Sequence, residues 1–454
     1  MILTTFAICY KIIYEVIKMA KIKAFNGYLY NQDKIDNLGK VTSLPYDSIT
    51  AKEQQELYEM HEYNAVRLVK GLQYDTDTPE DNQYTRAGKF LNDWIEKDIL
   101  VKDKSPAIYL YEQKVVFNKT TFKNTGFVAL LELDDKYKNV IPCEDTTPSS
   151  NRASYEILSH TKANLNMISC MYIESDKGLS RLINEVSESS PQAEFVLSDG
   201  TKERIWKITD QTKIDFITKE LSHHTVYISD GQNRYESSLQ YQKECIANNP
   251  DHTGDEPYNY IMTLLTNAYD DGMVMVPFHR LVKFQKEFNE SFFIAACQDN
   301  FKVEKIIVDT DTSEFVDTIK KQIGTTRHEN KIALYCGGSY FYRLTIKNRD
   351  ALKQFLPDKC DGYYNLDVAV LNNLILSDVL NITDDNYNER IDYTKSVTEG
   401  VQKVKSGEYG CLLAINPVKA EQVREVALAG EKLPPMSICV FPKPVTGTII
   451  NKLD

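Results

Sequence analysis

Apolar and polar residues alternate in several short segments of the chain, and segments with helical spacing lie between them. The alternation in AIYLYEQKVVF (107–117) and GFVALLEL (126–133) predicts two antiparallel strands joined through a polar connection. Three segments have apolar residues at helical spacing: RAGKFLNDWIEKDIL (86–100), RASYEILSHTKAN (152–164) and KAEQVREVALAG (419–430). Because hairpins and helices are mixed along the chain, the sequence predicts an α+β fold with mixed antiparallel sheets, and not a doubly wound parallel sheet.

Two Ser-Asp-Gly triplets are predicted to have different structures. Asp199-Gly200 lies between two alternating segments, AEFVLS and KERIWKI, so we expect a type I′ hairpin turn there. After Asp230-Gly231 the alternation stops, and Tyr235 and Leu239 begin a helical spacing. This second unit is therefore predicted to be a strand, a tight glycine turn and a helix. Such a unit directs backbone N–H groups and a helix N-terminus at one point, which suits an anion such as phosphate.

Three parts are expected along the chain. Residues 1–18 are expected to be an N-terminal extension outside the fold, residues 19–300 a core with inserted hairpins, and residues 301–454 a C-terminal α+β domain. Lys11, Glu15 and Lys18 interrupt the apolar N-terminus, so no stretch there is long enough to span a bilayer. We therefore expect no membrane anchor.

Charge and cysteine content narrow the classes of partner. The 454 residues carry a net charge of -12 and contain no dense cluster of Lys and Arg, whereas a protein that binds duplex DNA usually presents a basic face. Nucleic acid is therefore not the expected ligand. The nine cysteines are scattered and no two form a C-x-x-C pair, which argues against a disulfide framework or a zinc site. This usage is typical of a protein of the reducing cytoplasm.

Arg234 is the strongest candidate for ligand binding. In a turn that leads into a helix, its planar guanidinium suits two parallel hydrogen bonds to a phosphate, with the backbone of Gly231 close by. The alternative is a surface arginine that pairs with Glu236 or Asp230. The sequence supports the two interpretations equally.

Other candidates stand at the ends of predicted elements, and each has a plainer explanation. Asp47, before a helix, suits a metal ligand or a base, but an Asp there is more often a turn residue that accepts backbone hydrogen bonds. His279-Arg280 follows a strand and suits a second phosphate or a carboxylate, although a histidine satisfied at a sheet edge is the favoured interpretation. Glu144 is a candidate acid or base in an acidic loop, and Lys443 a candidate anion contact on a stiff turn.

The order of several short motifs resembles one family. These motifs are AKIKAFNGYLYN, LPYDSIT, YNAVRLV, YISDGQNRYESSL, VPFHRLV, LDVAVL and FPKPVTG. Together they resemble the bacterial "domain of unknown function 1015" family over the whole chain from Met19. The Asp-Gly-x-x-Arg turn is also similar to the phosphate motif of the ParB/sulfiredoxin superfamily, which includes free serine kinases. This second resemblance implies that the Gly231-to-Arg234 turn holds a nucleotide phosphate.

The resemblance also implies a function. It implies phosphate-group chemistry on a small hydroxy amino acid, as a serine kinase or a phosphoserine phosphatase that uses a nucleotide or pyrophosphate with Mg²⁺. The expected catalytic residues are then Asp47, Glu144 and Asp230, and the expected ligand-binding residues are Gly231, Gln232, Asn233, Arg234, Arg67, His279, Arg280 and Lys443. The partner would be a small phosphorylated molecule, and we expect neither a nucleic acid nor a membrane.

The chain departs from the family at positions that bear on catalysis. Relatives have two histidines where this chain has Gln232 and Asn233, a histidine in place of Cys143, and Lys-Ser-Thr in place of residues 436–438. The loss of imidazoles removes candidate general bases and cations. A degenerate paralogue that binds a nucleotide or a phosphometabolite without catalysis therefore stays open as an alternative. A ParB-like nucleic-acid factor is disfavoured by the acidity of the chain.

Overall fold

The computed structural model describes most of the chain after the expected extension, which lies outside the described residues. These are residues 20–117, 120–144, 148–174, 178–270, 272–284, 289–308, 312–324, 329–383 and 385–454. The chain forms two compact units. Unit 1 comprises Met1–Pro142, Thr146–Val274 and Pro442–Asp454, and unit 2 comprises Cys143–Asp145 and Met275–Phe441. The domain boundary expected between residues 300 and 301 falls inside unit 2, and the compact units offer Val274/Met275 as the alternative boundary.

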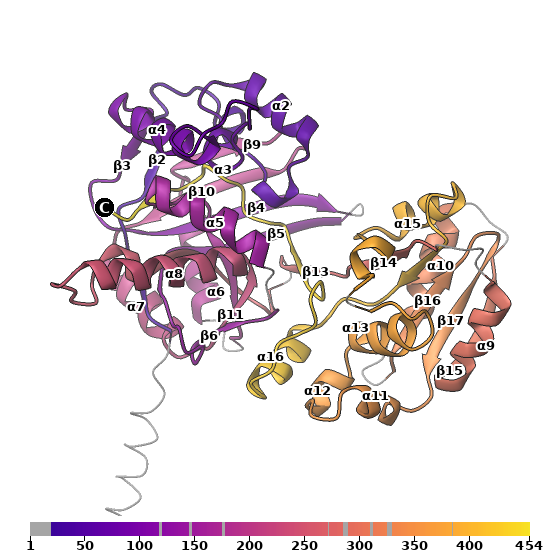
Figure 1. The fold of residues 1–454 in the computed structure, drawn as a ribbon. Helices are drawn as coiled ribbons and strands as arrows, with labels where there is room; N and C mark the ends of the chain where they lie inside the picture. The colour runs from indigo at the N-terminus through magenta and orange to yellow at the C-terminus, as the bar shows by residue number, and fades with distance from the viewer. Residues whose placement is uncertain are drawn as a thin grey trace, which may run out of the picture. The chain divides into compact units, whose positions relative to one another are not determined.

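Unit 1 is built on a mixed sheet that, within the described residues, has nine strands in the order β6-β11-β8-β12-β5-β4-β10-β9, with β1 paired to β5 (Figure 1). The strands are β1 Ile22–Lys23, β4 Ile108–Phe117, β5 Thr120–Glu132, β6 Val140–Pro142, β8 Ile168–Tyr172, β9 Ala193–Val196, β10 Lys202–Ile208, β11 Val226–Asp230 and β12 Tyr260–Asn267. β4 and β5 are antiparallel, which confirms the prediction from their alternation.

Side chains on alternate positions of this sheet face two different layers. On β5, Phe127 and Ala129 belong to a core shared with α6 (Gly178–Ser187), α7 (Gln211–Leu221) and α8 (Gln232–Asn248). Val128 and Leu130 belong instead to the core on the opposite face. Beyond that face lie β2 (Tyr28–Tyr30), β3 (Leu100–Lys102), α3 (Val66–Val69) and α4 (Gln83–Glu96). α5 (Pro148–Thr161) packs against both α4 and α8.

The two Ser-Asp-Gly triplets differ as predicted. β9 and β10 pair antiparallel around Asp199-Gly200, which confirms the hairpin. Its turn is not type I′: the Gly200 amide bonds to the Leu197 carbonyl (3.0 Å) and Gly200 alone has a positive φ of 85°. This is the three-residue loop in which a type I turn ends on a left-handed glycine. The second triplet ends β11 and leads through Gly231 into α8, which confirms the strand–turn–helix prediction.

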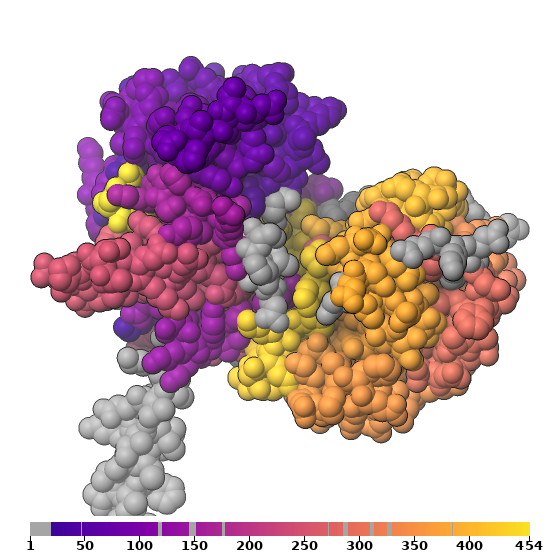
Figure 2. All heavy atoms as spheres, in the orientation of Figure 1, coloured from indigo at the N-terminus to yellow at the C-terminus, as the bar shows by residue number. Residues whose placement is uncertain are grey.

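The two ends of α8 have different surroundings. Tyr235, Ser237, Ser238 and Leu239 in its first half are buried, and the residues of its second half are half-buried or exposed. Figures 1 and 2 show the C-terminal end of α8 standing out at the surface of unit 1. The N-terminal end, where phosphate binding was predicted, is the more enclosed end, and its residues 230–234 are half-buried.

Unit 2 contains an antiparallel sheet that, in its described part, has six strands in the order β15-β17-β16-β19-β14-β18. The strands are β14 His279–Val282, β15 Phe301–Ile307, β16 Lys331–Tyr335, β17 Tyr340–Ile346, β18 Ile391–Thr394 and β19 Cys411–Ala414. α10 (Thr312–Ile323) and α15 (Val397–Lys405) cover one face. β16 and β17 form a hairpin on Gly337-Gly338, since they pair antiparallel and both glycines have positive φ.

The remaining elements connect or extend these layers. In unit 1 they are η1 Leu38–Lys40, η2 Tyr46–Ser48, α2 Ala51–Met60, β7 Ala163–Asn164, η3 Pro257–Asn259 and β21 Asn451–Lys452. Elsewhere they are β13 Val274–Val276, α9 Glu290–Asn300, α11 Asp350–Phe355, α12 Asp361–Tyr364, α13 Asp367–Val370, the π-helix η4 Leu371–Ser377, α14 Tyr387–Arg390, α16 Ala420–Leu428 and β20 Cys439–Phe441. Among the described residues, no helix has the length and apolar character needed to cross a membrane. The mixture of antiparallel sheets and helices is an α+β fold, as predicted.

Candidate functional site

The turn at Gly231 forms the N-terminus of α8 and leaves its first amides open. Gly231 has a φ of 91° and caps the helix without a side chain. In the described part of the chain, no residue accepts a hydrogen bond from the amides of Gln232, Asn233 or Arg234; the first helical bond runs from the Tyr235 amide to the Gly231 carbonyl (3.1 Å). Because the helix dipole also places partial positive charge at this end, the turn offers an anion site.

Two cations and one carboxylate stand beside this turn. The Asp230 Oδ2 atom lies 3.0 Å from Arg234 Nη2, and its Oδ1 atom lies 2.7 Å from Lys443 Nζ. The three side chains are only 16–18% exposed. The pairing of Arg234 with Asp230 is the one that the plainer interpretation anticipated, yet among the described residues the buried Arg234 Nε atom has no hydrogen-bond partner. The cluster of Asp230, Arg234 and Lys443, hereafter the α8 cluster, thus combines two cations with one carboxylate.

Glu236 is not part of the α8 cluster. Its carboxylate accepts hydrogen bonds from Gln232 Nε2 (2.8 Å) and from the Tyr137 hydroxyl (2.7 and 2.8 Å). The side-chain oxygen of Gln232 is buried and accepts no hydrogen bond from any described residue. Glu236 therefore orients Gln232 over the first turn of α8 and leaves Arg234 to Asp230.

Lys443 reaches the cluster from the C-terminal segment, which side chains of the sheet hold in place. Gln113 Nε2 donates to the Lys443 carbonyl and to Glu203 Oε1, each at 3.0 Å, and the Val445 amide donates to the Tyr111 hydroxyl (3.3 Å). Gln113 on β4 and Glu203 on β10 are directly opposite each other in the sheet. This network fixes the backbone that carries Lys443 and so fixes the position of its ammonium.

Glu203 makes the stability of unit 1 depend on pH. Its side chain is fully buried, and burial raises the pKa of its carboxyl to about 7 from its ordinary value of 4.5. Between these two pKa values the folded state keeps a proton that the unfolded state has lost. The contribution of Glu203 to the free energy of unfolding is therefore fully present below about pH 4.5 and is lost as the pH rises through 7. We expect Glu203→Gln to remove this fall in the free energy of unfolding.

The effect of Glu203→Gln is measurable by urea unfolding across this pH range, followed by the fluorescence of Trp94 and Trp206, the two tryptophans of the chain, which both lie in unit 1. Glu188→Gln, at an exposed position at the end of α6, is the control. An unchanged pH profile for Glu203→Gln would contradict the assignment of the raised pKa to this carboxyl.

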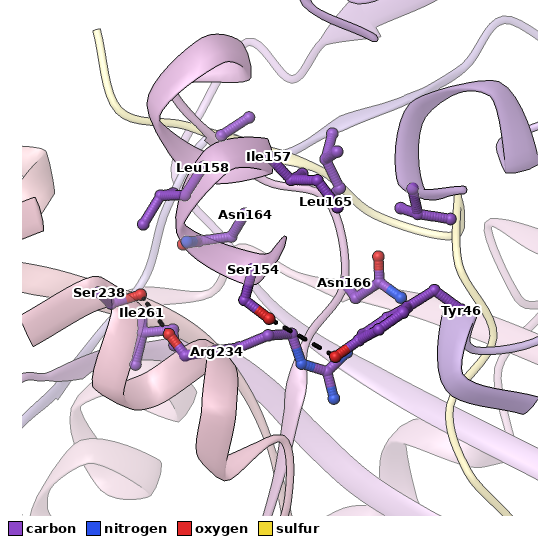
Figure 3. Close-up of a pocket in the computed structure, with 12 residues that line it drawn as sticks. Tyr46, Ser154, Ile157, Leu158, Asn164, Leu165, Asn166, Arg234, Ser238 and Ile261 are labelled. Atoms are coloured by element: carbon purple, nitrogen blue, oxygen red, sulfur yellow. Dashed lines mark hydrogen bonds between the residues drawn. The ribbon is translucent and has the colours of Figure 1, made fainter. Parts of the chain in front are cut away.

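A small cavity of about 50 Å³ adjoins the Arg234 side chain (Figure 3). It is lined by Tyr46, Val69, Ser154, Ile157, Leu158, Ala163, Asn164, Leu165, Asn166, Arg234, Ser238 and Ile261. Figure 3 shows the Arg234 side chain extending from α8 towards Tyr46, whose hydroxyl is 3.5 Å from Ser154 Oγ. At about 10–15 Å³ per water, the cavity has room for roughly four waters, which suits a small polar group and not a whole nucleotide.

The turn and the α8 cluster contain the predicted unit 1 residues other than Arg67 and Asp47. Arg67 donates to the Tyr58 carbonyl (2.8 Å) and stacks on the Tyr58 ring at 4.2 Å. It is not one of the cavity-lining residues. Asp47 belongs to η2 together with Tyr46, but its side chain lies outside the described part of the chain. Their roles in ligand binding or catalysis therefore stay predictions.

Glu144 belongs to unit 2 and sits in a cradle of backbone amides. Its carboxylate accepts hydrogen bonds from Met436 (3.2 Å), Ser437 (3.0 Å) and Ile438 (2.5 Å). Burial raises the pKa of this carboxyl to about 7, against the opposite effect of these amides. A carboxyl that titrates near neutrality suits acid–base chemistry, so the predicted role of Glu144 stays open.

His279 and Arg280 also belong to unit 2, on β14. His279 is 3% exposed and its Nδ1 accepts a hydrogen bond from the Ile415 amide (3.3 Å). Burial, assisted by Arg280 and Lys320, lowers the pKa of His279 to about 3, so it has no charge to offer a phosphate at neutral pH. β14 lies between β19 and β18, so this histidine is satisfied inside the sheet and not at its edge. Arg280 is fully buried, donates to the Phe278 carbonyl and lies 5.1 Å from the centre of the Tyr393 ring.

Sequence reasoning missed the polar residues that line the cavity and the network that holds Lys443. Tyr46 lies within the LPYDSIT motif beside Asp47, so the motif pointed to the right segment but to the neighbouring side chain. Gln113 and Glu203 become partners only once the register of β4 and β10 is known. Among the described residues, no group of three or more His, Cys, Asp or Glu is arranged to hold a metal ion.

Comparisons with solved structures give weak likenesses. A conserved hypothetical protein from Pyrococcus furiosus is 12% identical with a TM-score of 0.33, over 69% of this chain and 92% of that chain. A free serine kinase in complex with AMP is 11% identical with a TM-score of 0.34, over 69% and 88%. SbnI with a C-terminal truncation from Staphylococcus aureus is 8% identical with a TM-score of 0.34, over 70% and 85%. At these values the likenesses carry no argument about the site.

Sequence comparison identifies the family. No curated protein matches the chain. A family model described as "Protein of unknown function (DUF1015)" matches residues 22–369, which is well over half of the chain. The family resemblance is thereby confirmed over residues 22–369, a range that does not include the FPKPVTG motif, and the chain belongs to the DUF1015 family.

Proposed function

We propose that this protein binds the phosphoryl group of a small phosphorylated molecule at the N-terminus of α8, between Arg234 and Lys443. The observation that carries the proposal is the α8 cluster: two cations and the open amides of the first helical turn stand beside one left-handed glycine. Hydrogen bonds from charged donors and helix-terminal amides are the usual means of holding phosphate.

The reaction class that fits this site is phosphoryl-group chemistry on a small hydroxy amino acid, as in a serine kinase or a phosphoserine phosphatase. The cavity beside Arg234 is small, and Tyr46, Ser154 and Asn166 give it hydroxyl and amide groups that suit a hydroxy amino acid. A nucleotide or pyrophosphate would place only its terminal phosphate at the cluster. The free serine kinase structure contains AMP, but the proposal rests on the geometry of this chain.

The α8 cluster does not fit a resident Mg²⁺. Asp230 is its one carboxylate, and both of its oxygens already contact cations. Mg²⁺ is usually held by one or two carboxylates together with substrate phosphates. The proposed chemistry therefore has no step that depends on Mg²⁺ at this cluster.

Binding with slow turnover is the form of this function that the residues favour. The side-chain amides of Gln232 and Asn233 donate hydrogen bonds, but at neutral pH they cannot take up a proton from a substrate hydroxyl. While the ion pairs to Arg234 and Lys443 hold, Asp230 has no oxygen free to take the proton of a substrate hydroxyl. The cluster thus offers strong phosphate binding and a poor general base.

Restoring imidazoles tests whether the missing base limits turnover. We expect the double variant Gln232→His/Asn233→His to turn over serine with a phosphoryl donor, or phosphoserine alone, about 10²-fold faster or more than the unmodified protein. Affinity should change little, because only the transition state gains an interaction. Rapid turnover by the unmodified protein would contradict slow catalysis and would support a fully active enzyme.

Removing the charge of Asp230 tests how the cluster binds its ligand. Asp230 competes with a phosphate for Arg234 and Lys443, so we expect Asp230→Asn to tighten pyrophosphate binding by about 0.5–1 kcal/mol, the range for partly exposed ion pairs. Asp199→Asn, in the other Ser-Asp-Gly triplet, is the matched control. Weaker binding in Asp230→Asn would mean that this carboxylate contacts the ligand directly.

The ligand class is tested by thermal shift with pyrophosphate, AMP, ADP, ATP, serine and phosphoserine. A ligand of the folded state raises the apparent stability by mass action, so phosphorylated compounds should raise the melting temperature and serine alone should raise it less. No shift with any phosphorylated compound would refute the proposed function.

A further inference from the structure

Two cysteines of unit 2 lie at the end of one strand pair: Cys411 begins β19, and Cys336 directly follows the last residue of β16. β16 and β19 are antiparallel, with Ala333, Leu334 and Tyr335 paired to Ala414, Leu413 and Leu412. One step further in this register, Cys336 faces Cys411. Directly opposite residues of an antiparallel pair have Cα atoms about 4.5 or 5.5 Å apart, and a disulfide needs about 4.4–6.8 Å. The register alone therefore brings the two sulfurs within bonding reach.

The side chains of this pair lie on the same face of the sheet. Leu412 and Tyr335 point into the core beneath α10 and α15, so the next residue on each strand, Cys411 and Cys336, points to the other face. The proximity of the Cys336 thiol, in addition to burial, raises the pKa of the Cys411 thiol. Because both side chains share one face, no strand has to rotate for the sulfurs to meet.

The two sulfurs differ in access to solvent. Cys411 is fully buried, whereas Cys336 is half-buried and stands just before the Gly337-Gly338 turn. A third thiol, Cys297 of α9, is also fully buried, and burial together with Cys336 raises its pKa to about 12. Cys336 is thus the member that a soluble oxidant reaches first, and Cys411 is the opposite sulfur in register.

We propose that Cys336 and Cys411 form a reversible cross-strand disulfide, with a hydroperoxide as the oxidant. The Cys336 thiol gives up its proton, the thiolate attacks one oxygen of hydrogen peroxide, the O–O bond breaks, and Cys336 becomes a sulfenic acid while the other oxygen takes up that proton and leaves as water. The Cys411 sulfur then attacks the Cys336 sulfur, the S–O bond breaks and a second water leaves. Two thiols and one hydrogen peroxide give one disulfide and two waters. A dithiol reverses the modification.

The test uses the full chain treated with hydrogen peroxide, followed by thiol titration after denaturation and by peptide mapping without reduction. We expect two fewer titratable thiols than the nine of the reduced chain, a single linked peptide pair containing Cys336 and Cys411, and recovery with dithiothreitol. Cys336→Ser should lose none of its remaining thiols, and Cys297→Ser should lose the same two as the unmodified chain. A link from Cys336 to Cys297, or no loss of thiols, would overturn the proposal.

A second variant keeps the test informative if a substitution in the sheet disturbs folding. Cys411→Ser leaves the accessible sulfur without its partner, so a 1,3-dicarbonyl probe should trap a sulfenic acid at Cys336 in this variant and much less of it in the unmodified chain. Equal trapping in both proteins would show that Cys411 does not resolve the sulfenic acid. Cys245 and Cys360, which are also half-buried, serve as internal controls for oxidation by access alone.

Discussion

Gly231→Ala is expected to destabilise unit 1 by about 2–5 kcal/mol and to weaken phosphate binding about as much as loss of the Arg234 guanidinium does. A left-handed residue with a Cβ costs about 1–2 kcal/mol, and overpacking adds about 1–3 kcal/mol. The added Cβ would lie 2.7 Å from Arg234 Nη2 and 2.7 Å from Ile168 Cγ2. Because Ile168 is held within β8, the Arg234 guanidinium has to move instead. This guanidinium is the group that we expect to hold the phosphate.

The matched control for Gly231→Ala is Gly200→Ala. Gly200 has nearly the same backbone conformation, with a φ of 85°, but apart from its chain neighbours no atom of the described residues lies within 4 Å of an added Cβ. Gly200→Ala should lower the free energy of unfolding by only about 1–2 kcal/mol, because of the left-handed conformation, and should leave phosphate binding intact. Urea unfolding and pyrophosphate titration of both variants separate the cost of conformation from the cost of the contact. Equal losses in the two variants would contradict a special role for the space above Gly231.

Arg234→Ala is expected to weaken pyrophosphate binding by about 1.5–3 kcal/mol, the range for hydrogen bonds to a charged group. This corresponds to an increase of about 10- to 150-fold in Kd. Within the part of the chain that the structure describes, its Nε atom has no hydrogen-bond partner, and Nη2 shares Asp230 with Lys443, so the guanidinium has donors to offer a phosphate. Arg234→Lys keeps the charge without the planar fork and should lose an intermediate amount.

Arg181→Ala, on the exposed side of α6, is the control for Arg234→Ala in the same titration. It changes the net charge equally but stands outside the cluster, so its Kd should match that of the unmodified protein. If both variants lose the same affinity, binding reflects net charge and not the α8 cluster.

Local patterns predicted the turn but not the cluster around it. The end of alternation after Gly231 distinguished a helix start from the hairpin at Gly200, because side-chain periodicity follows backbone conformation. Asp-Gly between strands did not determine the turn type, since a three-residue loop and a two-residue loop both accept this pair. The hairpin was therefore predictable and its geometry was not.

Contacts between segments that are far apart along the chain could not be predicted from the sequence. Lys443 reaches Asp230 because the C-terminal segment returns to unit 1 and is held by Gln113. The spacing of apolar and polar residues does not indicate where this segment packs. The same holds for Cys336 and Cys411, which look scattered in the sequence and become neighbours only through the pairing of β16 with β19. The neutral state of His279 likewise follows from burial in the middle of a sheet, which its motif alone did not reveal.

Hydrogen exchange of the full chain with and without pyrophosphate, read by mass spectrometry, tests the central claim most directly. The open amides of Gln232, Asn233 and Arg234 exchange readily when they bond only to water and slow down when they bond to phosphate oxygens. We predict that pyrophosphate protects peptides covering residues 231–236 and the segment around Lys443, and that Arg234→Ala removes this protection. Saturable binding of pyrophosphate that protects other segments and leaves residues 231–236 unchanged would contradict the assignment of the site.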